Sequence, residues 1–376
     1  MNNNIKLDIK KPEPLYHMVK KKIVEMVRNG DLKHGDRLPP EEEIAKQNNI
    51  SRGTVRMALE DLAREGIIKR YPKRGTFISL EKSNIFIKIA ILSLTISVGR
   101  KETDFYRNEL WGGIEEGVVK EGTGITFLNH QKGIEFSKDI DGILFLVPLR
   151  SEIEILNKIK RKGIPLIVVG VQIDGFNYVS VDNEKGVEKA ISYLVKLGHK
   201  KIGGIFSSLD YFDSFYRYKG YLSTLKKFNL PIKKEWIKII SEMDAEKWIE
   251  ESEKKTEEIL SEKDKPTAIF SAGEFLTLGA KKSIEKKGYK IPSDISLIGF
   301  DDFYLAKYLE PPLTVISQPV WEIGKIGVEK LVEIINNRQT QPYQLLLQPD
   351  LIVRGSTSKT GKEVEKCSRE KRMALH

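Results

Sequence analysis

The stretch Ile50-Ser51-Arg52-Gly53-Thr54-Val55-Arg56 decides the fold of the first part of the chain. Ser51 is a good N-cap residue, because its hydroxyl can accept a hydrogen bond from a free backbone N–H at the start of a helix. From Val55 onward, apolar residues recur at the spacing i, i+3, i+4 and i+7, which predicts a helix with one buried face. Arg52 and Arg56 lie four residues apart on the other face, near the helix N-terminus. A helix that enters the major groove of DNA presents side chains to base edges at this end.

The flanking residues complete a DNA-binding fold. Upstream, Leu38–Ala45 contains prolines followed by acidic residues, which is typical of the start of a short helix. Downstream, Gly66–Tyr71 and Gly75–Ser79 predict two short strands joined by a basic tip. Two helices followed by a two-stranded wing make a winged helix-turn-helix. The alternative for the two arginines, a merely solvated helix face, is disfavoured because the cap, the spacing and the wing agree.

The segment from Asp36 to Phe77 resembles the DNA-binding domain of the GntR family. The resemblance implies that Arg52, Thr54 and Arg56 contact bases or phosphates, and that Gly75 lets the wing approach the minor groove. The residues expected to bind double-stranded operator DNA are Arg37, Ser51, Arg52, Thr54, Arg56, Lys73, Arg74 and Gly75.

Two residues depart from the GntR pattern. Glu42 stands where many relatives carry a DNA-contacting arginine, and Lys73 replaces the first of two wing glycines. The base preference of better-known members therefore does not transfer to this chain, and the sequence leaves the operator and the target genes open.

The charge distribution is consistent with nucleic-acid binding. The formal net charge is +10, and residues 1–80 alone hold 17 Lys and Arg against 11 Asp and Glu. A basic module attracts the phosphate backbone and makes binding salt-dependent. At 376 residues the chain is too long for one ordinary domain, so a second, large domain must follow. Its single cysteine, Cys367, excludes an intramolecular disulfide and suits a reducing cytoplasm.

No segment predicts secretion or a membrane span. The N-terminus is rich in Asn and Lys and lacks the apolar run of a signal peptide. The longest apolar stretch, Ile85–Val98, is too short to cross a bilayer and contains Lys88. We therefore expect a cytoplasmic protein with no membrane partner.

Beyond the wing, short apolar strands alternate with amphipathic helices. This alternation predicts parallel sheets joined by right-handed crossovers. The expected fold class is multidomain, with an N-terminal winged helix-turn-helix (α+β) at residues 1–80 and an α/β body of Rossmann-like parallel sheets at residues 87–357. Residues 81–86 form the expected linker. Residues 358–376 are polar and charged, which predicts a flexible tail.

Several motifs in the body resemble the LacI/GalR family of sugar-responsive repressors. In the family's order, they are Val181–Ile202, Pro266–Phe270, Ile291–Asp302, Pro311–Pro319 and Leu351–Thr357. The resemblance implies a periplasmic-binding-protein-like body, in which two α/β subdomains enclose a ligand cleft and which also carries dimerisation. A GntR-type head on such a body is the layout of the arabinose-repressor group of regulators.

A sugar offers hydroxyls and an apolar face, so its site needs carboxylates, guanidinium groups and aromatic rings. Asp301 follows a predicted strand, at the carboxyl end where open α/β sheets bind ligands. By resemblance, Arg217 occupies a ligand-binding position and Tyr106 a position often held by a stacking ring. The alternatives are an ion pair of Arg217 with Asp210 or Asp213, a cap, and a hydrophobic staple for Tyr106. The expected effector-binding residues are Tyr106, Arg107, Asp182, Arg217, Met243, Glu274 and Asp301.

Some of these residues depart from the family pattern. Glu274 follows a glycine where relatives have Asn-Asp, Arg107 replaces a second aromatic residue, and Met243 replaces Phe or Trp. Charged residues beside Arg217 and Asp301 predict an unusually ionic pocket. The expected effector is therefore a polar sugar, either L-arabinose-like or another carbohydrate such as a sugar acid or phosphate.

The sequence contains no pattern of an active site. The histidines are scattered without a partner at metal-ligand spacing, and His199 belongs to a Gly-His turn that we expect to be structural. The usual nucleophile and phosphate-binding motifs are missing. We therefore expect no enzyme, no metal and no cofactor. A fused aminotransferase-like body would need a cofactor-lysine region, and an exported sugar-binding protein would need an export signal in place of the winged helix.

The expected function is ligand-linked repression of sugar-utilisation genes. A homodimer would present two heads to a pseudo-palindromic operator, and sugar binding in the cleft would release the DNA. The helices at residues 321–336 and after Asn108 are candidates for the dimer interface, and core packing is an equal alternative for each. A corepressor-dependent regulator, an activator and a sugar-binding protein without a regulatory role remain as alternatives.

Overall fold

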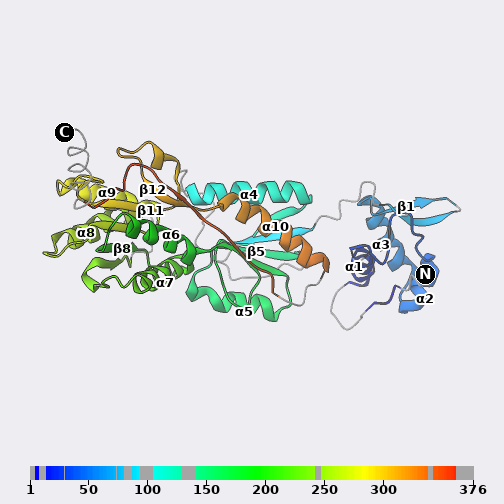
Figure 1. Ribbon diagram of the computed structural model, residues 1–376. Helices are drawn as coiled ribbons and strands as arrows, with labels where there is room; N and C mark the ends of the chain where they lie inside the picture. The colour runs from blue at the N-terminus through cyan, green and yellow to red at the C-terminus, as the bar shows by residue number, and fades with distance from the viewer. Residues whose placement is uncertain are drawn as a thin grey trace.

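The structure is a computed structural model of the chain. It describes residues 5–7, 14–28, 30–72, 74–79, 87–93, 105–128, 140–241, 247–337 and 342–360. A small helical head with a two-stranded wing precedes a body of two α/β subdomains (Figure 1). The expected linker at residues 81–86 lies outside the described residues, as does the expected tail from residue 361 onward.

The head packs three helices around one apolar core. Its elements are α1 (Leu15–Arg28), α2 (Glu41–Asn48), α3 (Arg52–Arg64), β1 (Ile68–Tyr71) and β2 (Gly75–Ile78). The apolar face of α3 is buried, as its helical spacing predicts; its members are Val55, Ala58, Leu59 and Leu62. β1 and β2 pair antiparallel, so the predicted winged helix-turn-helix is confirmed.

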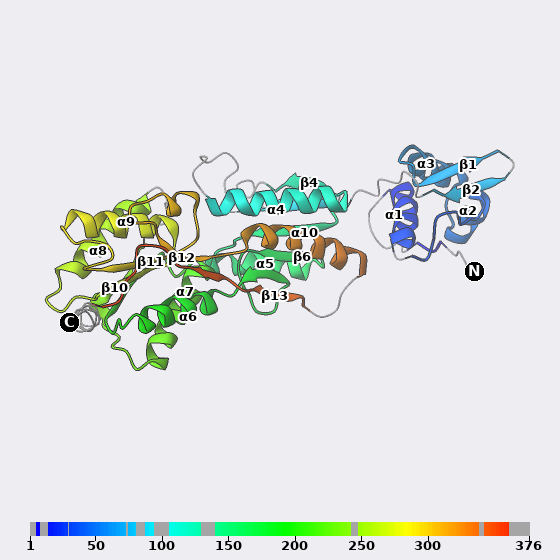
Figure 2. The same cartoon turned by 45° about the horizontal axis from the view of Figure 1, so that its top comes forward.

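The first subdomain of the body is a six-stranded parallel sheet in the order β13-β7-β6-β5-β3-β4. Its strands are β3 (Lys88–Leu92), β4 (Gly124–Phe127), β5 (Gly142–Leu146), β6 (Leu166–Val169), β7 (Tyr178–Val181) and β13 (Gln344–Leu347). Helices α4 (Phe105–Glu121) and α10 (Val320–Asn337) cover one face, and η2 (Arg150–Glu152) leads into α5 (Ile153–Arg161) on the other (Figures 1 and 2).

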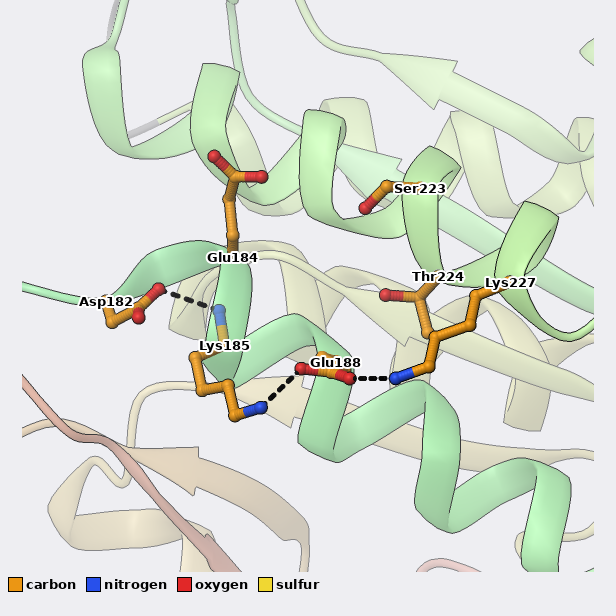
Figure 3. A pocket seen from close by; sticks show the side chains of 7 residues that line it. All are labelled: Asp182, Glu184, Lys185, Glu188, Ser223, Thr224 and Lys227. Atoms are coloured by element: carbon orange, nitrogen blue, oxygen red, sulfur yellow. Dashed lines mark hydrogen bonds and ion pairs between the residues drawn. The ribbon is translucent and has the colours of Figure 1, made fainter.

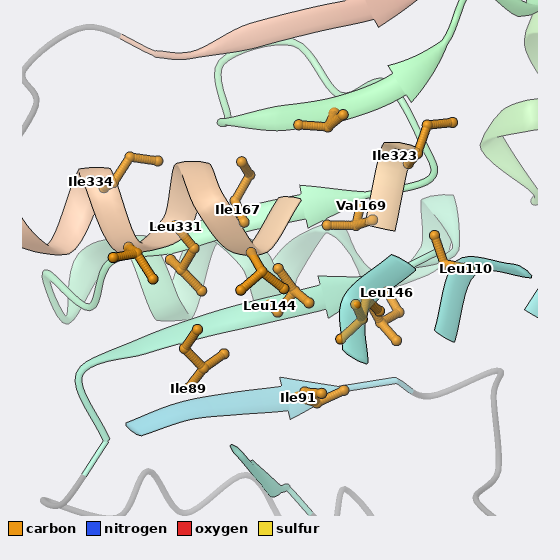
Figure 4. Packing of buried hydrophobic residues seen from close by; sticks show 14 of the residues in the cluster. Ile89, Ile91, Leu110, Leu144, Leu146, Ile167, Val169, Ile323, Leu331 and Ile334 are labelled. Carbon is orange, nitrogen blue, oxygen red and sulfur yellow. The ribbon is translucent and has the colours of Figure 1, made fainter. Parts of the chain in front are cut away.

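The helix expected at residues 321–336 is packed mainly into the core. Side chains of α10, including Ile323 and Leu331, meet the sheet in one buried cluster (Figure 4). Its backbone also touches α4, because a Cβ at Gly113 would lie 1.9 Å from the carbonyl oxygen of Trp321. Glycine is therefore required at position 113 for the two helices to approach.

The second subdomain is a six-stranded sheet in the order β14-β12-β11-β10-β8-β9, in which β14 pairs antiparallel with β12 and the other pairs are parallel. Its strands are β8 (Ile202–Phe206), β9 (Ile237–Ile239), β10 (Ala268–Ser271), β11 (Ser296–Phe300), β12 (Thr314–Ser317) and β14 (Asp350–Ile352). One face carries α6 (Asn183–Lys196) and α7 (Phe212–Lys227), and the other carries α8 (Trp248–Ser261) and α9 (Glu274–Lys286). The short turns are η3 (Lys234–Trp236) and η5 (Tyr304–Lys307).

The chain crosses between the subdomains three times, at residues 181–183, 317–320 and 347–350. The carboxyl end of β7 leads directly into the second subdomain, and the carboxyl end of β12 leads directly back into the first. The carboxyl ends of both sheets therefore face each other. This arrangement confirms the two parallel-sheet subdomains predicted from the sequence. It also brings together the carboxyl strand ends, where open α/β sheets bind ligands.

The described start of the expected tail is bonded to the body. Ser358 donates its N–H to Ser296 Oγ at 3.0 Å, and Thr360 donates its N–H to the carbonyl oxygen of Leu197 at 3.1 Å. Residues 358–360 therefore belong to the second subdomain.

Candidate functional site

The recognition helix α3 presents a polar face at its N-terminus. Ser51 Oγ accepts the N–H of Thr54 at 3.0 Å, so Ser51 caps the helix. Arg52 and Arg56 expose 60% and 51% of their side chains. Backbone N–H groups and two guanidinium groups at one helix end are hydrogen-bond donors. Phosphate oxygens and base edges of DNA can accept such hydrogen bonds.

Glu41, at the start of α2, binds three arginines of the head. The Nε atoms of Arg52 and Arg56 lie 3.3 and 3.4 Å from Glu41 Oε2. Arg70 of β1 places Nη2 3.2 Å from the other carboxylate oxygen. One carboxylate therefore joins α2, α3 and the wing, and it orients three arginines, two of which (Arg52 and Arg56) are expected to contact DNA. Sequence reasoning missed Glu41, because these partners are 11 to 29 residues away along the chain.

The wing is shaped by a close approach between Gly75 and Arg37. Gly75 has φ +113°, and a Cβ there would lie 2.8 Å from Nε of Arg37. Arg37 also forms a β-bridge with Phe77. Gly75 thus makes space for a guanidinium group that lies along the wing. Arg74 is exposed beside the tip, whereas Lys73 lies outside the described residues.

Arg217 of α7 is the most constrained residue of the expected effector site. It is 3% exposed. Its Nε donates to Asn183 Oδ1 at 2.7 Å, and its Nη1 donates to the carbonyl oxygen of Ala272 at 2.8 Å. The guanidinium carbon lies 3.8 Å from the ring centroid of Phe300, within cation–π range. These contacts hold the guanidinium in one orientation.

Two carboxylates flank this guanidinium. Asp213 Oδ2 lies 3.5 Å from Nη2 of Arg217, and Asp301 Oδ2 lies 3.7 Å from Nη1. Both separations exceed those of a charge-assisted hydrogen bond. Asp213 Oδ1 is buried without a hydrogen-bond partner among the described residues. Arg217 thus forms the ion pair with Asp213 that the sequence offered as an alternative to ligand contact. Asp301 belongs to the same cluster of charged side chains.

Asp301 adopts a strained backbone conformation directly after β11. Its φ is +80°, and a non-glycine residue in this region costs about 1–3 kcal/mol. Its N–H donates to the carbonyl oxygen of Ile316 at 2.8 Å, and the side-chain amide of Gln318 donates to Asp301 Oδ1. The surrounding bonds thus hold the carboxylate at the carboxyl end of the sheet. Val147, after β5 of the facing sheet, also has a positive φ, +42°.

Tyr106 and Arg107 begin α4 on the facing subdomain. The hydroxyl oxygen of Tyr106 lies 2.7 Å from the position that a Cβ at Gly170 would take, so the ring reaches the carboxyl end of β6. Arg107 is close enough to Tyr211 of the other subdomain to act on its ionisation. Burial raises the pKa of Tyr211 to about 12, and the positive charge of Arg107 opposes this shift.

Glu274 begins α9, is 9% exposed, and stands beside an aromatic row. Tyr211 meets Trp248 edge-to-face with centroids 5.5 Å apart, and Trp248 meets Phe275 at 6.5 Å. Sequence reasoning missed this row, because its rings come from three elements. Met243 lies outside the described residues.

The structure places Asp182 away from this cluster. Its carboxylate accepts the N–H of Lys185 at 2.9 Å and caps α6. It lines a surface hollow of about 320 Å³ between α6 and α7, where Glu188 binds both Lys185 and Lys227 (Figure 3). Its neighbour Asn183, rather than Asp182, accepts a hydrogen bond from Arg217.

Both parts of the chain match known families. Residues 15–78 match the bacterial regulatory proteins of the gntR family, and residues 191–357 match the periplasmic binding protein-like domain. Crystal structures of LacI-type regulators from Bacillus cereus subsp. cytotoxis and Chloroflexus aggregans share the fold of the body. Their TM-scores are 0.65 and 0.64 at 21% and 24% identity, over 73% and 72% of this chain and 99% of each of theirs.

Two relatives cover the head and the body together. The arabinose metabolism transcriptional repressor of Geobacillus stearothermophilus is 27% identical over 365 residues, which are 92% of this chain and 98% of that protein. The HTH-type transcriptional repressor ExuR of Bacillus subtilis (strain 168) is 27% identical over 335 residues, which are 84% and 97% of the two chains.

Head and body together define a transcriptional repressor with a DNA-binding domain and a sugar-repressor-type ligand domain. The chain is an arabinose-repressor-like regulator, with a GntR-type winged helix fused to a LacI/GalR-type body. Its relatives are non-enzymatic regulators, in agreement with the prediction that the chain is not an enzyme. Within the described part of the chain, no helix has the length and apolarity required to cross a membrane.

Proposed function

We propose that this protein represses sugar-utilisation genes and leaves its operator when a neutral, hydroxyl-rich sugar binds in the cleft. The observation that carries the proposal is the buried guanidinium of Arg217 between the carboxylates of Asp213 and Asp301. A sugar hydroxyl accepts a hydrogen bond from a guanidinium and donates one to a carboxylate. Such a cluster suits vicinal hydroxyls, and the rings of Tyr211 and Trp248 suit an apolar sugar face.

The same arrangement favours a neutral sugar over a sugar acid or a sugar phosphate. The positive charge of Arg217 is already opposed by Asp213 and Asp301, so a further anionic group would meet like charge there. We therefore propose a neutral sugar as the effector, in place of the charged sugar that Arg107 and Glu274 suggested from the sequence.

Repression would follow from the way the head joins the body. The head precedes β3, so it is attached to the first subdomain. Closure of the cleft rotates this subdomain and moves the two heads of a dimer out of register with the operator half-sites, which in turn depend on dimer geometry. A coupling of about 1–3 kcal/mol would change operator affinity roughly 5- to 150-fold. Action on operator DNA places the protein in the cytoplasm.

An exposed apolar face on the first subdomain supports a homodimer. Trp111 of α4 stacks on Phe127 of the edge strand β4, with centroids 5.6 Å apart. Trp111, Ile125 and Phe127 are 36%, 39% and 48% exposed. Clustered aromatic side chains beside an unpaired strand edge are typical of interaction surfaces. A second copy of the chain, related by a two-fold axis, would cover this face with its own counterpart.

Fluorescence anisotropy tests the proposed function. The probe is a duplex that the wild-type protein selects from a random library. The panel contains L-arabinose, D-ribose, D-xylose, D-galactose, D-galacturonate and D-glucuronate. One neutral sugar should weaken operator binding 5- to 150-fold. Release by the uronates alone would contradict the neutral-sugar proposal, and tightening of the complex would indicate a corepressor.

A matched pair of variants locates the response in the cleft. Asp301→Asn should lose the sugar response while it keeps wild-type operator affinity. Asp294→Asn changes a carboxylate of the same subdomain that accepts the N–H of Lys290, and it should respond like the wild type. Equal loss of response in both variants would show that the effect of Asp301→Asn is not specific to the cleft.

A further inference from the structure

Two loops, one from each subdomain, meet across the cleft. The first follows β5 and contains Arg150 and Ser151, and the second follows β8 and contains residues 209–211. Both loops extend from the carboxyl ends of their strands. The contact therefore lies on the side of each sheet that faces the cleft.

Asp210 is at the centre of this contact. Its Oδ1 accepts the backbone N–H of Ser151 at 2.9 Å, and its Oδ2 accepts the Ser151 hydroxyl at 2.7 Å. Arg150 donates its N–H to the Asp210 carbonyl oxygen at 2.8 Å and its Nη1 to the carbonyl oxygen of Leu209 at 3.2 Å. The Arg150 guanidinium carbon also lies 4.1 Å from the ring centroid of Phe215. Four hydrogen bonds and a cation–π contact thus join the subdomains.

The contact lies away from the crossovers that act as the hinge. In the first sheet the chain crosses at β7 and β13, and β5 is separated from β7 by β6. In the second sheet it crosses at β12 and β14, and β8 is separated from β12 by β10 and β11. A rotation about the crossovers therefore separates these loops while the hinge strands stay together. Opening of the cleft by such a rotation would therefore break the four hydrogen bonds.

Apolar contacts accompany the polar ones. Phe212 of the second subdomain packs against the core cluster under α5 of the first. Phe105 of the first subdomain packs against the core cluster between α8, α9 and the second sheet. Each subdomain therefore packs one partly buried aromatic ring against the core of the other, and opening of the cleft would expose more of both rings to water.

We infer that Asp210 and Ser151 are positioning residues that hold the cleft closed over the bound effector. This inference rests on the proposed function, because it assigns the two residues a role in effector binding without direct contact with the sugar. Each hydrogen bond at a partly exposed site contributes only modestly to the free energy of closure. The contact between Asp210 and Ser151, called the clasp below, therefore forms and breaks reversibly. Its effect is to slow effector release and to raise effector affinity.

Titration calorimetry with the same sugar panel tests the clasp. Asp210→Ala removes both acceptors of the Ser151 bonds and should weaken the affinity for the responding sugar about tenfold. Ser151→Ala removes one bond and should weaken it about threefold. Asp294→Ala is the control, since it removes a carboxylate that accepts an N–H within one subdomain. Wild-type affinity in Asp210→Ala would overturn the inference.

Small-angle scattering separates this inference from the proposed function. If no sugar in the panel binds the wild-type protein, the proposed function fails, and the clasp is judged by shape alone. The Asp210→Ala protein should then have a larger radius of gyration than the wild type, because the open cleft is populated more. An unchanged radius would overturn the clasp. Thermal unfolding of Ser151→Ala and Asp210→Ala confirms that both variants are folded.

Discussion

His199 lies buried in the turn after α6 and joins segments that are distant in sequence. Its Nδ1 is 2.9 Å from the hydroxyl of Thr267, and its Nε2 is 3.0 Å from the carbonyl oxygen of Ser358. The carbonyl can only accept, so the Nε2 of the neutral ring carries the proton. Burial lowers the pKa of His199, and the bond to Ser358 opposes this shift. His199 therefore has a structural role, in agreement with the expectation from its place in a Gly-His turn.

This lowered pKa predicts acid sensitivity of the fold. The unfolded chain takes up a proton at His199 near pH 6.5, whereas the folded state takes it up only at lower pH. The unfolded state therefore binds more protons below about pH 6.5, and stability falls as the pH drops through this range. Thermal unfolding of the wild type and of His199→Asn at pH 7.5 and 5.5 measures this contribution. The variant should lose less stability between the two pH values, and an equal loss would contradict the assignment.

At the scale of elements, the head is organised by the meeting of α2, α3 and β1. Each element has a local cause: an acidic first turn in α2, the Ser51 cap of α3, and the turn that ends at Gly75 for the wing. Glu41 links all three through Arg52, Arg56 and Arg70. In the absence of DNA, the Glu41 carboxylate thus restrains the side chains of these three arginines.

Loss of this carboxylate should reduce sequence discrimination. Glu41→Gln keeps the size of the side chain and removes the charge that orients the arginines. We expect tighter binding to a scrambled duplex and a ratio of specific to non-specific affinity about tenfold lower, or about 1.4 kcal/mol. Anisotropy with the selected and scrambled duplexes at two salt concentrations measures both quantities.

Glu42→Gln is the matched control for this prediction. It makes the same charge change one residue away, and Glu42 forms no ion pair with the described residues among the salt bridges of the head. If both variants changed discrimination equally, general electrostatics rather than orientation by Glu41 would account for the effect.

At the scale of the whole molecule, three crossovers join two sheets whose carboxyl ends face each other. A rotation of one subdomain against the other would act at these crossovers, and the hydrogen bonds between Ser151 and Asp210 would oppose opening. Under the proposed function, effector binding at Arg217 would move the first subdomain, to which the head is attached. Transmission to DNA would also require a second copy, since one displaced head alone changes no spacing between half-sites.

The dimer proposal predicts that a charge on the apolar face separates the copies. Phe127→Glu would place like charges against each other across a two-fold axis, while the fold should persist because Phe127 is 48% exposed. We expect a monomer by light scattering and operator affinity about 10²- to 10⁴-fold weaker, because the two heads no longer bind together. Ile239→Glu, on the edge strand β9 of the other sheet, is the control and should remain dimeric.

Much of the fold could be predicted from local patterns. The buried face of α3 follows from apolar residues at helical spacing, and the parallel sheets follow from strands that alternate with helices. The position of Asp301 at a carboxyl strand end follows from the same alternation. Asn183 could not be placed in this way: Asp182 was the expected site residue, yet it caps α6, and its neighbour Asn183 holds Arg217. Which of two adjacent polar residues reaches Arg217 depends on the rotation of α6 against the sheet.

By itself, the sequence determined the class of this protein: a winged helix-turn-helix joined to a body of two parallel-sheet subdomains, with Arg217 and Asp301 expected at the ligand site. These features rest on interactions among residues close in the chain, which residue type and spacing control. Only the tertiary structure decided that Glu41 orients three arginines, that Arg217 lies between two carboxylates, and that Asp210 meets Ser151. Each of these contacts joins residues from separate elements, so it depends on how the elements pack rather than on what any one segment prefers.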